Sequence, residues 1–71
     1  MRVRIDQQSD ALYVDFTGTE IESSAEVAEG IILDYDKDGC LVGIEILDAY
    51  KKAGDADVLR HLVLDVPDVA P

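Results

Sequence analysis

Hydrophobic and polar residues alternate in short runs along the first part of the chain. Apolar side chains occupy every second position in Arg2–Asp6 and again in Ala11–Thr17. A period of two is typical of strands that bury one face. The polar run Gln7–Asp10 between them indicates a turn, so these segments are predicted to form a β-hairpin with a four-residue loop.

The densest apolar stretch, Gly30–Leu47, repeats this pattern on both sides of the turn Asp36–Gly39. Asp-Gly between two alternating runs is a strong hairpin signal, because glycine adopts positive φ without a Cβ clash. This second hairpin is expected to be the centre of the fold. Both of its faces carry apolar residues, so we expect it to be covered on both sides, by a helix or a second subunit. The residues that suggest this are Ile32, Leu41 and Leu47.

The segment between the hairpins follows neither period. In Glu20–Glu29, Ser23 and Ser24 favour a short helical turn with Glu26 as a partial cap, and an irregular strand is equally compatible.

The end of the chain predicts a helix. Asp48 and Asp55 are candidate N-caps, and Ala56–Leu64 carries an amphipathic stripe. Pro67 and Pro71 indicate a frayed terminus. The fold class is therefore predicted to be α+β, with a small antiparallel sheet of about four strands in two hairpins and a C-terminal helix. We expect a single domain over residues 1–71, with the sheet in 1–50 and the helix and tail in 51–71.

Size and charge restrict the possible partners. A chain of 71 residues buries only a small core. We therefore expect a homodimer, because association adds to the stability that a small core provides. The net charge is −10, and no Lys or Arg occurs from Ile5 to Asp36. Nucleic acid and anionic membranes would be repelled, whereas a basic protein partner is compatible. No segment is typical of a membrane span or a signal peptide, so a cytoplasmic location is expected.

One motif indicates a metal. The pattern D-x-D-x-D-G-x5-E of an EF-hand calcium loop is matched by Asp34, Asp36, Asp38, Gly39 and Glu45. An EF-hand also needs a helix before its loop, and Gly30-Ile31-Ile32-Leu33 favours a strand. Solvation of a hairpin tip is therefore the preferred interpretation, and no cofactor or metal is expected.

Catalytic signals are sparse. His61 is the only histidine and no nucleophile elbow accompanies it, so an enzyme is not expected and no catalytic residue is assigned. Cys40 is the only cysteine, which excludes an intrachain disulfide, and we expect its thiol to be buried in a strand. Tyr13 and Tyr35 are expected to share one sheet face, as cross-strand packing, a binding patch or a dimer seam.

Three segments of the chain resemble the prokaryotic family known as domain of unknown function 2283. They are Asp10–Val14 (D-A-L-Y-V), 30–36 (G-I-I-L-D-Y-D) and 42–49 (V-G-I-E-I-L-D-A), and the similarity covers roughly residues 3 to 52. The resemblance implies a small sheet-centred domain with no established activity and no catalytic residues to carry over. It also implies a hairpin at the Asp-rich turn.

These observations favour a non-enzymatic protein-interaction or self-association module. Two alternatives stay open. The first is an antitoxin-like acidic partner of a small basic protein, since the family resemblance suggests pairing with small basic toxins. The second is a calcium-binding protein built on Asp34, Asp36, Asp38 and Glu45.

Overall fold

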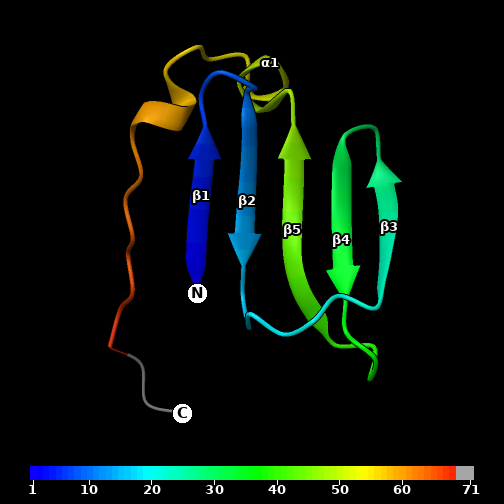
Figure 1. Ribbon diagram of the computed structural model, residues 1–71. Helices are drawn as coiled ribbons and strands as arrows, with labels where there is room; N and C mark the ends of the chain where they lie inside the picture. Colours follow the sequence, from blue (N-terminus) through cyan, green and yellow to red (C-terminus); the bar gives the residue numbers. More distant parts are fainter. Residues whose placement is uncertain (69–71) are drawn as a thin grey trace.

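The computed structural model describes residues 1–68 and contains one antiparallel sheet of five strands, followed by a short helix, α1 (Figure 1). Along the sheet the order is β1-β2-β5-β4-β3, so β5 lies at the centre and β1 and β3 form the edges. The elements are β1 (Arg2–Asp6), β2 (Ala11–Asp15), β3 (Ser23–Ala28), β4 (Ile31–Tyr35), β5 (Leu41–Leu47), α1 (Ala49–Ala53) and a 3-10 turn, η1 (Val58–Arg60).

Both predicted hairpins are confirmed. β1 pairs with β2 across the four-residue loop 7–10, and β4 pairs with β5 across the Asp-rich turn. The turn glycine Gly39 has φ 79, as the Asp-Gly signal requires. The second hairpin is the middle of the sheet because β5 also pairs with β2.

The sheet has five strands where about four were predicted. The additional strand is β3, in the segment whose period was ambiguous, and it pairs with β4 through a bulge between Glu26 and Ala28. All six of its residues are exposed, so burial imposes no alternation on them. The Glu26 carboxylate accepts a 2.9 Å hydrogen bond from the Gly30 amide and closes the turn to β4.

The predicted α+β class with a C-terminal helix is confirmed, but the position Ala56–Leu64 predicted for the helix is wrong. The observed helix, α1, begins directly after β5 and ends at Gly54, whose φ of 71 provides a left-handed C-cap. Asp48 holds the N-cap position, yet its side chain makes no capping hydrogen bond. Asp55 caps only a turn, by accepting a 2.9 Å hydrogen bond from the Asp57 amide. A helix over residues 56–64 would be short, and short helices depend on tertiary packing. Residues 61–68 are exposed and have no such packing. Pro71 lies outside the described residues.

The register divides the sheet into two unlike faces, because partner residues of antiparallel strands share a face. One, the apolar face, carries Val3, Ile5, Leu12, Val14, Ile31, Leu33, Ile44 and Ile46. The other, the polar face, carries Arg4, Tyr13, Ser24, Ile32, Asp34 and Glu45.

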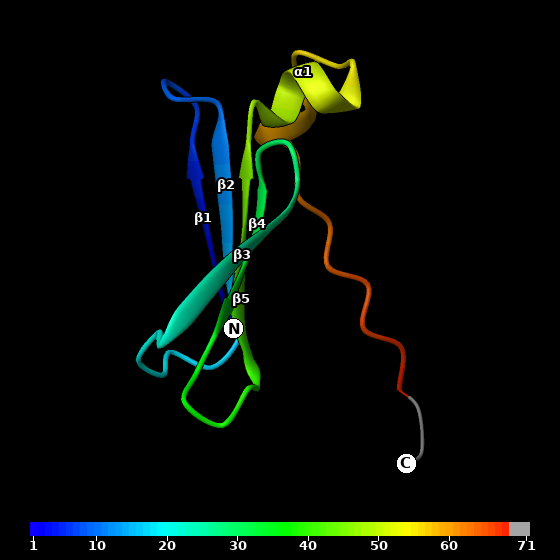
Figure 2. The same cartoon turned by 90° about the vertical axis from the view of Figure 1, so that its right-hand side faces the viewer.

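The helix and the end of the chain lie on the side of the apolar face. In Figure 1, β5 runs upward with β2 on its left, and the Val42 carbonyl points to β2, accepting a 2.7 Å hydrogen bond from the Phe16 amide. In an upward strand of L-residues, this orientation directs the Val42 side chain, and with it Ile44 and Ile46, away from the viewer. Figure 2 shows α1 and residues 61–68 on that rear side, and the loop before β3 on the other.

Candidate functional site

The apolar face is buried at Val42 and only half-buried at its centre. At its centre Ile44 lies opposite Val14 and Leu33, and Ile46 lies opposite Leu12 and Ile31. All of these side chains are only half-buried. Within residues 1–68, α1 contacts η1 and does not extend across the strands, and the only buried apolar side chains are Val42 and Ala49. The described residues therefore leave the apolar face of the sheet without a second layer.

The accessible area agrees with a missing layer. The chain exposes 5541 Å². A compact monomer of 7.8 kDa exposes about 4,400 Å². The excess is about 1,100 Å² by this scaling, and the extended residues 61–68, which are all exposed, contribute to it. Partners in a standard protein interface each bury about 800 Å².

Side-chain hydrogen bonds link three strands across the polar face. Asp34 on β4 is 5% exposed, and its two carboxylate oxygens accept bonds from Tyr13 on β2 (3.1 Å) and Ser24 on β3 (2.5 Å). The Tyr13 phenol reaches Asp34 by passing over Gly43 of β5, where a Cβ would lie 2.5 Å from its hydroxyl. The guanidinium of Arg4 stacks 5.0 Å from the centre of the same ring.

This arrangement was missed by sequence reasoning, although one signal pointed to it. A glycine inside a strand pattern indicates the close approach of another group, and Gly43 interrupts the alternation of β5. Burial, followed by the hydrogen bond to Asp34, raises the pKa of Tyr13. The expectation that Tyr13 and Tyr35 share a face is wrong, since Tyr35 follows Asp34 directly along β4 and so faces the opposite side.

The four calcium candidates do not converge. Asp34 is engaged with Tyr13 and Ser24, and Glu45 lies on β5 opposite Tyr13 and Ile32. β4 is a strand at the place where an EF-hand requires a helix. In the described part of the chain, no three His, Cys, Asp or Glu side chains are arranged to hold a metal ion.

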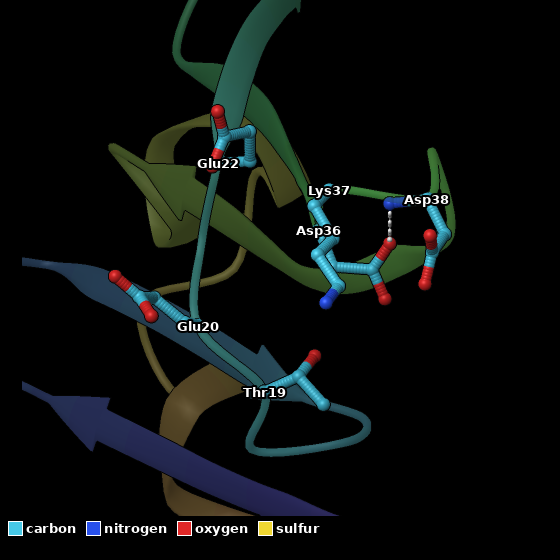
Figure 3. Close-up of a pocket in the computed structure, with 6 residues that line it drawn as sticks. All are labelled: Thr19, Glu20, Glu22, Asp36, Lys37 and Asp38. Carbon is cyan, nitrogen blue, oxygen red and sulfur yellow. Dashed lines mark hydrogen bonds between the residues drawn. The ribbon is translucent and has the colours of Figure 1, made fainter.

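Asp36 stabilises the turn instead. One of its carboxylate oxygens accepts hydrogen bonds of 2.9 Å from the amides of Asp38 and Cys40. The turn borders a shallow pocket, which Figure 3 shows from close by. Cys40 is exposed and precedes β5, so the expectation of a buried thiol is wrong. The pocket is lined by Thr19, Glu20, Glu22, Asp36, Lys37 and Asp38.

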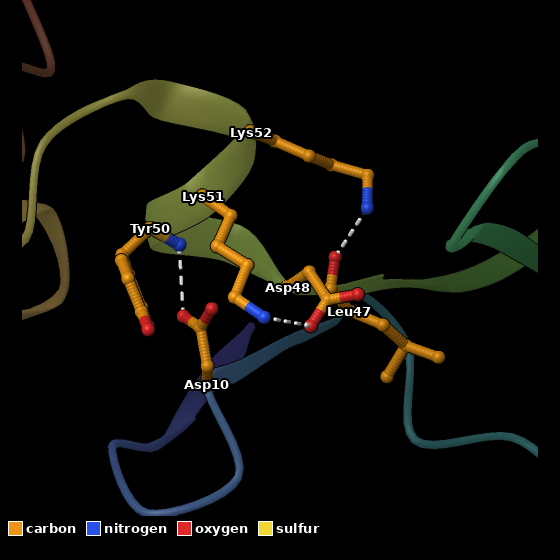
Figure 4. A network of polar contacts seen from close by, with 6 residues as sticks. All are labelled: Asp10, Leu47, Asp48, Tyr50, Lys51 and Lys52. Carbon is orange, nitrogen blue, oxygen red and sulfur yellow. Dashed lines mark hydrogen bonds and ion pairs between the residues drawn. The ribbon is translucent and has the colours of Figure 1, made fainter.

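A second polar network joins the first hairpin loop to α1 (Figure 4). Asp10, with φ 54, accepts a 3.0 Å bond from the Ala49 amide at its carbonyl and a 2.8 Å bond from the Tyr50 amide at its carboxylate. Lys52 donates to the Leu47 carbonyl. These bonds position α1 at the end of the sheet, so the network is structural.

His61 begins the extended C-terminal segment and is exposed. None of the helices within residues 1–68 combines the length and apolar character that a membrane span requires.

Comparison with known proteins identifies the family. The model of the family described as protein of unknown function DUF2283 matches residues 2–49, from the first strand into α1. No curated protein and no solved structure matches the chain.

Proposed function

The chain belongs to the DUF2283 family of proteins of unknown function, and we propose that it is a non-enzymatic self-association module in which the apolar faces of two copies pack together. The observation that carries the proposal is the uncovered apolar face centred on Ile44 and Ile46. Sheets are stable when their apolar face is packed against another layer, and this chain supplies no such layer within residues 1–68.

A second copy fits this face better than the chain's own end does. Five strands at a spacing of about 4.8 Å make a face about 20 Å wide, which one extended segment cannot cover. The apolar face of another copy has the same width and the same chemistry, and two such faces pack about 10 Å apart in a sandwich. A twofold arrangement of this kind is closed, so it ends at the dimer.

The described side chains give no support to catalysis. Each oxygen of the Asp34 carboxylate already accepts a hydrogen bond, from Tyr13 or from Ser24, and the residue is 5% exposed, so little of it is accessible to a substrate. One oxygen of the Asp36 carboxylate accepts both hydrogen bonds of the turn. These engagements favour a binding role. The antitoxin-like role, the calcium role and the cytoplasmic location stay predictions.

The experiment compares the same substitution on the two faces of adjacent strands. Ile44→Asp places a carboxylate at the centre of the apolar face, and Ile32→Asp places one on the polar face of β4. We expect analytical ultracentrifugation to give a dimer for the unmodified chain and for Ile32→Asp. Ile44→Asp should weaken dimerisation at least about 100-fold, since a charge would be buried at the interface.

Circular dichroism of each variant verifies that the sheet is retained. A monomeric unmodified chain, or a folded Ile44→Asp variant that dimerises as tightly as Ile32→Asp, would contradict the proposal.

A further inference from the structure

The end of the chain is an extended apolar segment that contacts little of its own molecule. Residues 61–68, the C-terminal arm, follow η1, and His61 has the extended values φ −131 and ψ 120. The exposed fractions of Leu62, Val63, Leu64 and Val66 are 58%, 86%, 68% and 84%. Within residues 1–68, no backbone hydrogen bond joins the arm to the rest of the chain. An apolar segment of this kind is suited to pairing with a sheet edge.

The pattern of the arm is that of one strand. Leu62, Leu64 and Val66 alternate with Val63 and Asp65, and Pro67 then ends any ladder. The alternating part has five residues, as β1 does. An arm strand would therefore match β1 in length, with one apolar side and one side that carries an acidic residue.

Charge distinguishes the two free edges of the sheet. β1 carries Arg2 and Arg4, which form no salt bridge among the described residues, and one acidic residue, Asp6, whose carboxylate accepts hydrogen bonds from Ser9. β3 carries Glu26 and is flanked by Glu22 and Glu29, which would repel an acidic arm. In a chain with net charge −10, a basic edge is the exception, and it complements the acidic arm.

We propose that the C-terminal arm of one copy adds as a strand to the β1 edge of a second copy, with Asp65 beside Arg4. The inference rests on the proposed self-association. In this register Leu64 and Val66 flank Val3 and Ile5 and widen the apolar face that the two copies share. The match is centred on Arg4, so it holds whether the added strand runs parallel or antiparallel to β1.

The position of the arm favours exchange between copies. Figure 2 shows the arm separated from its own strands on the side of the apolar face, and Figure 1 shows it beyond the β1 edge. A segment that leaves its own sheet on that side is directed at the second copy. Each copy donates one arm and accepts one, so the exchange keeps the twofold symmetry.

The first test is a charge swap. Arg4→Glu and Asp65→Arg should each weaken the dimer about 3- to 10-fold, as loss of one paired charge at an interface predicts. The double variant should restore the affinity of the unmodified chain. Lys37→Glu and Asp38→Arg make the same changes in net charge on the remote turn and serve as the matched controls. Double variants no tighter than the singles would overturn the pairing.

The second test separates exchange from folding back. In a Cys40→Ser background, chains with Arg4→Cys are mixed with chains that carry Asp65→Cys and a mass tag. We expect oxidation to yield the mixed disulfide in preference to either like pair, seen by intact mass. Absence of the mixed product, or closure within one chain when both cysteines are on the same copy, overturns the proposal.

The two proposals fail in different ways. If only the arm proposal is wrong, the chain remains dimeric, Ile44→Asp is monomeric and no mixed disulfide forms. If only the packing of the apolar faces is wrong, Ile44→Asp still dimerises and the mixed disulfide still forms.

Discussion

At the scale of single residues, the polar face depends on Gly43. The Tyr13 hydroxyl reaches Asp34 over this glycine, and a Cβ there would also lie 2.7 Å from the Val14 carbonyl oxygen. The contact with backbone cannot be relieved by a side-chain rotation alone. Three strands are linked in this way: β2 through Tyr13, β4 through Asp34 and β3 through Ser24.

We therefore predict that Gly43→Ala lowers the free energy of unfolding by about 1–3 kcal/mol, as overpacking of a close contact does. Urea denaturation followed by circular dichroism measures the change. Tyr13→Phe removes the hydroxyl yet keeps the Val14 contact, so adding it to Gly43→Ala should recover only part of the loss. A Gly43→Ala variant as stable as the unmodified chain would show that the phenol does not need this path.

The same phenol predicts a dependence on pH. Burial and the hydrogen bond to Asp34 raise the pKa of Tyr13 above its ordinary value of about 10. The folded state holds the phenolic proton more tightly than the unfolded state. The resulting stabilisation is complete below the unfolded pKa and is lost as the pH rises through the folded pKa.

Titration of tyrosinate absorbance should therefore include a step above the ordinary tyrosine pKa, and Tyr13→Phe should remove that step. The variant should also lose less stability than the unmodified chain as the pH is raised beyond about 10. An unchanged titration curve in Tyr13→Phe would contradict the assignment.

At the scale of elements, the Asp-rich turn is held by Asp36. Asp36→Ala removes the acceptor for the Asp38 and Cys40 amides, and we expect it to cost about 1–2 kcal/mol of stability. Asp38→Ala is the matched control, because Asp38 is exposed at the tip and no side-chain hydrogen bond of it is observed in the described residues. Thermal unfolding of the two variants compares them directly. Equal losses would show that the turn depends on its charge and not on the Asp36 bonds.

The C-terminal segment shows how context decides between elements. The apolar residues of Ala56–Leu64 fit a helical stripe, yet a helix needs a surface on which to place that stripe. The chain has already left the sheet at Gly54, and only Leu59 in this segment is partly buried. The residues of this segment that follow η1 remain extended, and in our proposal they pair with another copy.

At the scale of the whole molecule, charge opposes association. Two copies at −10 each repel one another, and salt screens this repulsion over about 10 Å at 0.1 M. Packing of apolar faces is not weakened by moderate salt. We therefore predict that dimerisation tightens several-fold between 0.05 and about 0.5 M NaCl, in sedimentation equilibrium experiments.

A dimer that weakens over this range would show that charge pairing, and not the apolar face, dominates self-association. Binding to a basic protein should show the reverse trend, with loss of affinity as salt is added. The salt dependence thus also separates self-association from the antitoxin-like role.

The sequence by itself determined the two hairpins, their turns and the family. Alternation over β1, β2, β4 and β5 is a local pattern imposed by one-sided burial, and the turns depend on neighbouring residues such as Asp36 and Gly39. It also determined which residues share a face within each strand, because side chains alternate along a strand whatever it pairs with.

Only the tertiary structure decided the strand order, the fifth strand, the helix and the sites. β3 is exposed along its length, so its pairing with β4 left no hydrophobic pattern to recognise. The link from Tyr13 over Gly43 to Asp34 joins residues 21 positions apart and exists only because β5 lies between β2 and β4. The calcium candidates are close in sequence, yet they do not form a metal site, since Asp34 is held by Tyr13 and Ser24, Asp36 is bonded to the turn, and the hairpin places Glu45 on β5 opposite Ile32. The sequence also could not show whether the apolar face is covered, because that depends on which layer of the tertiary structure packs against the sheet.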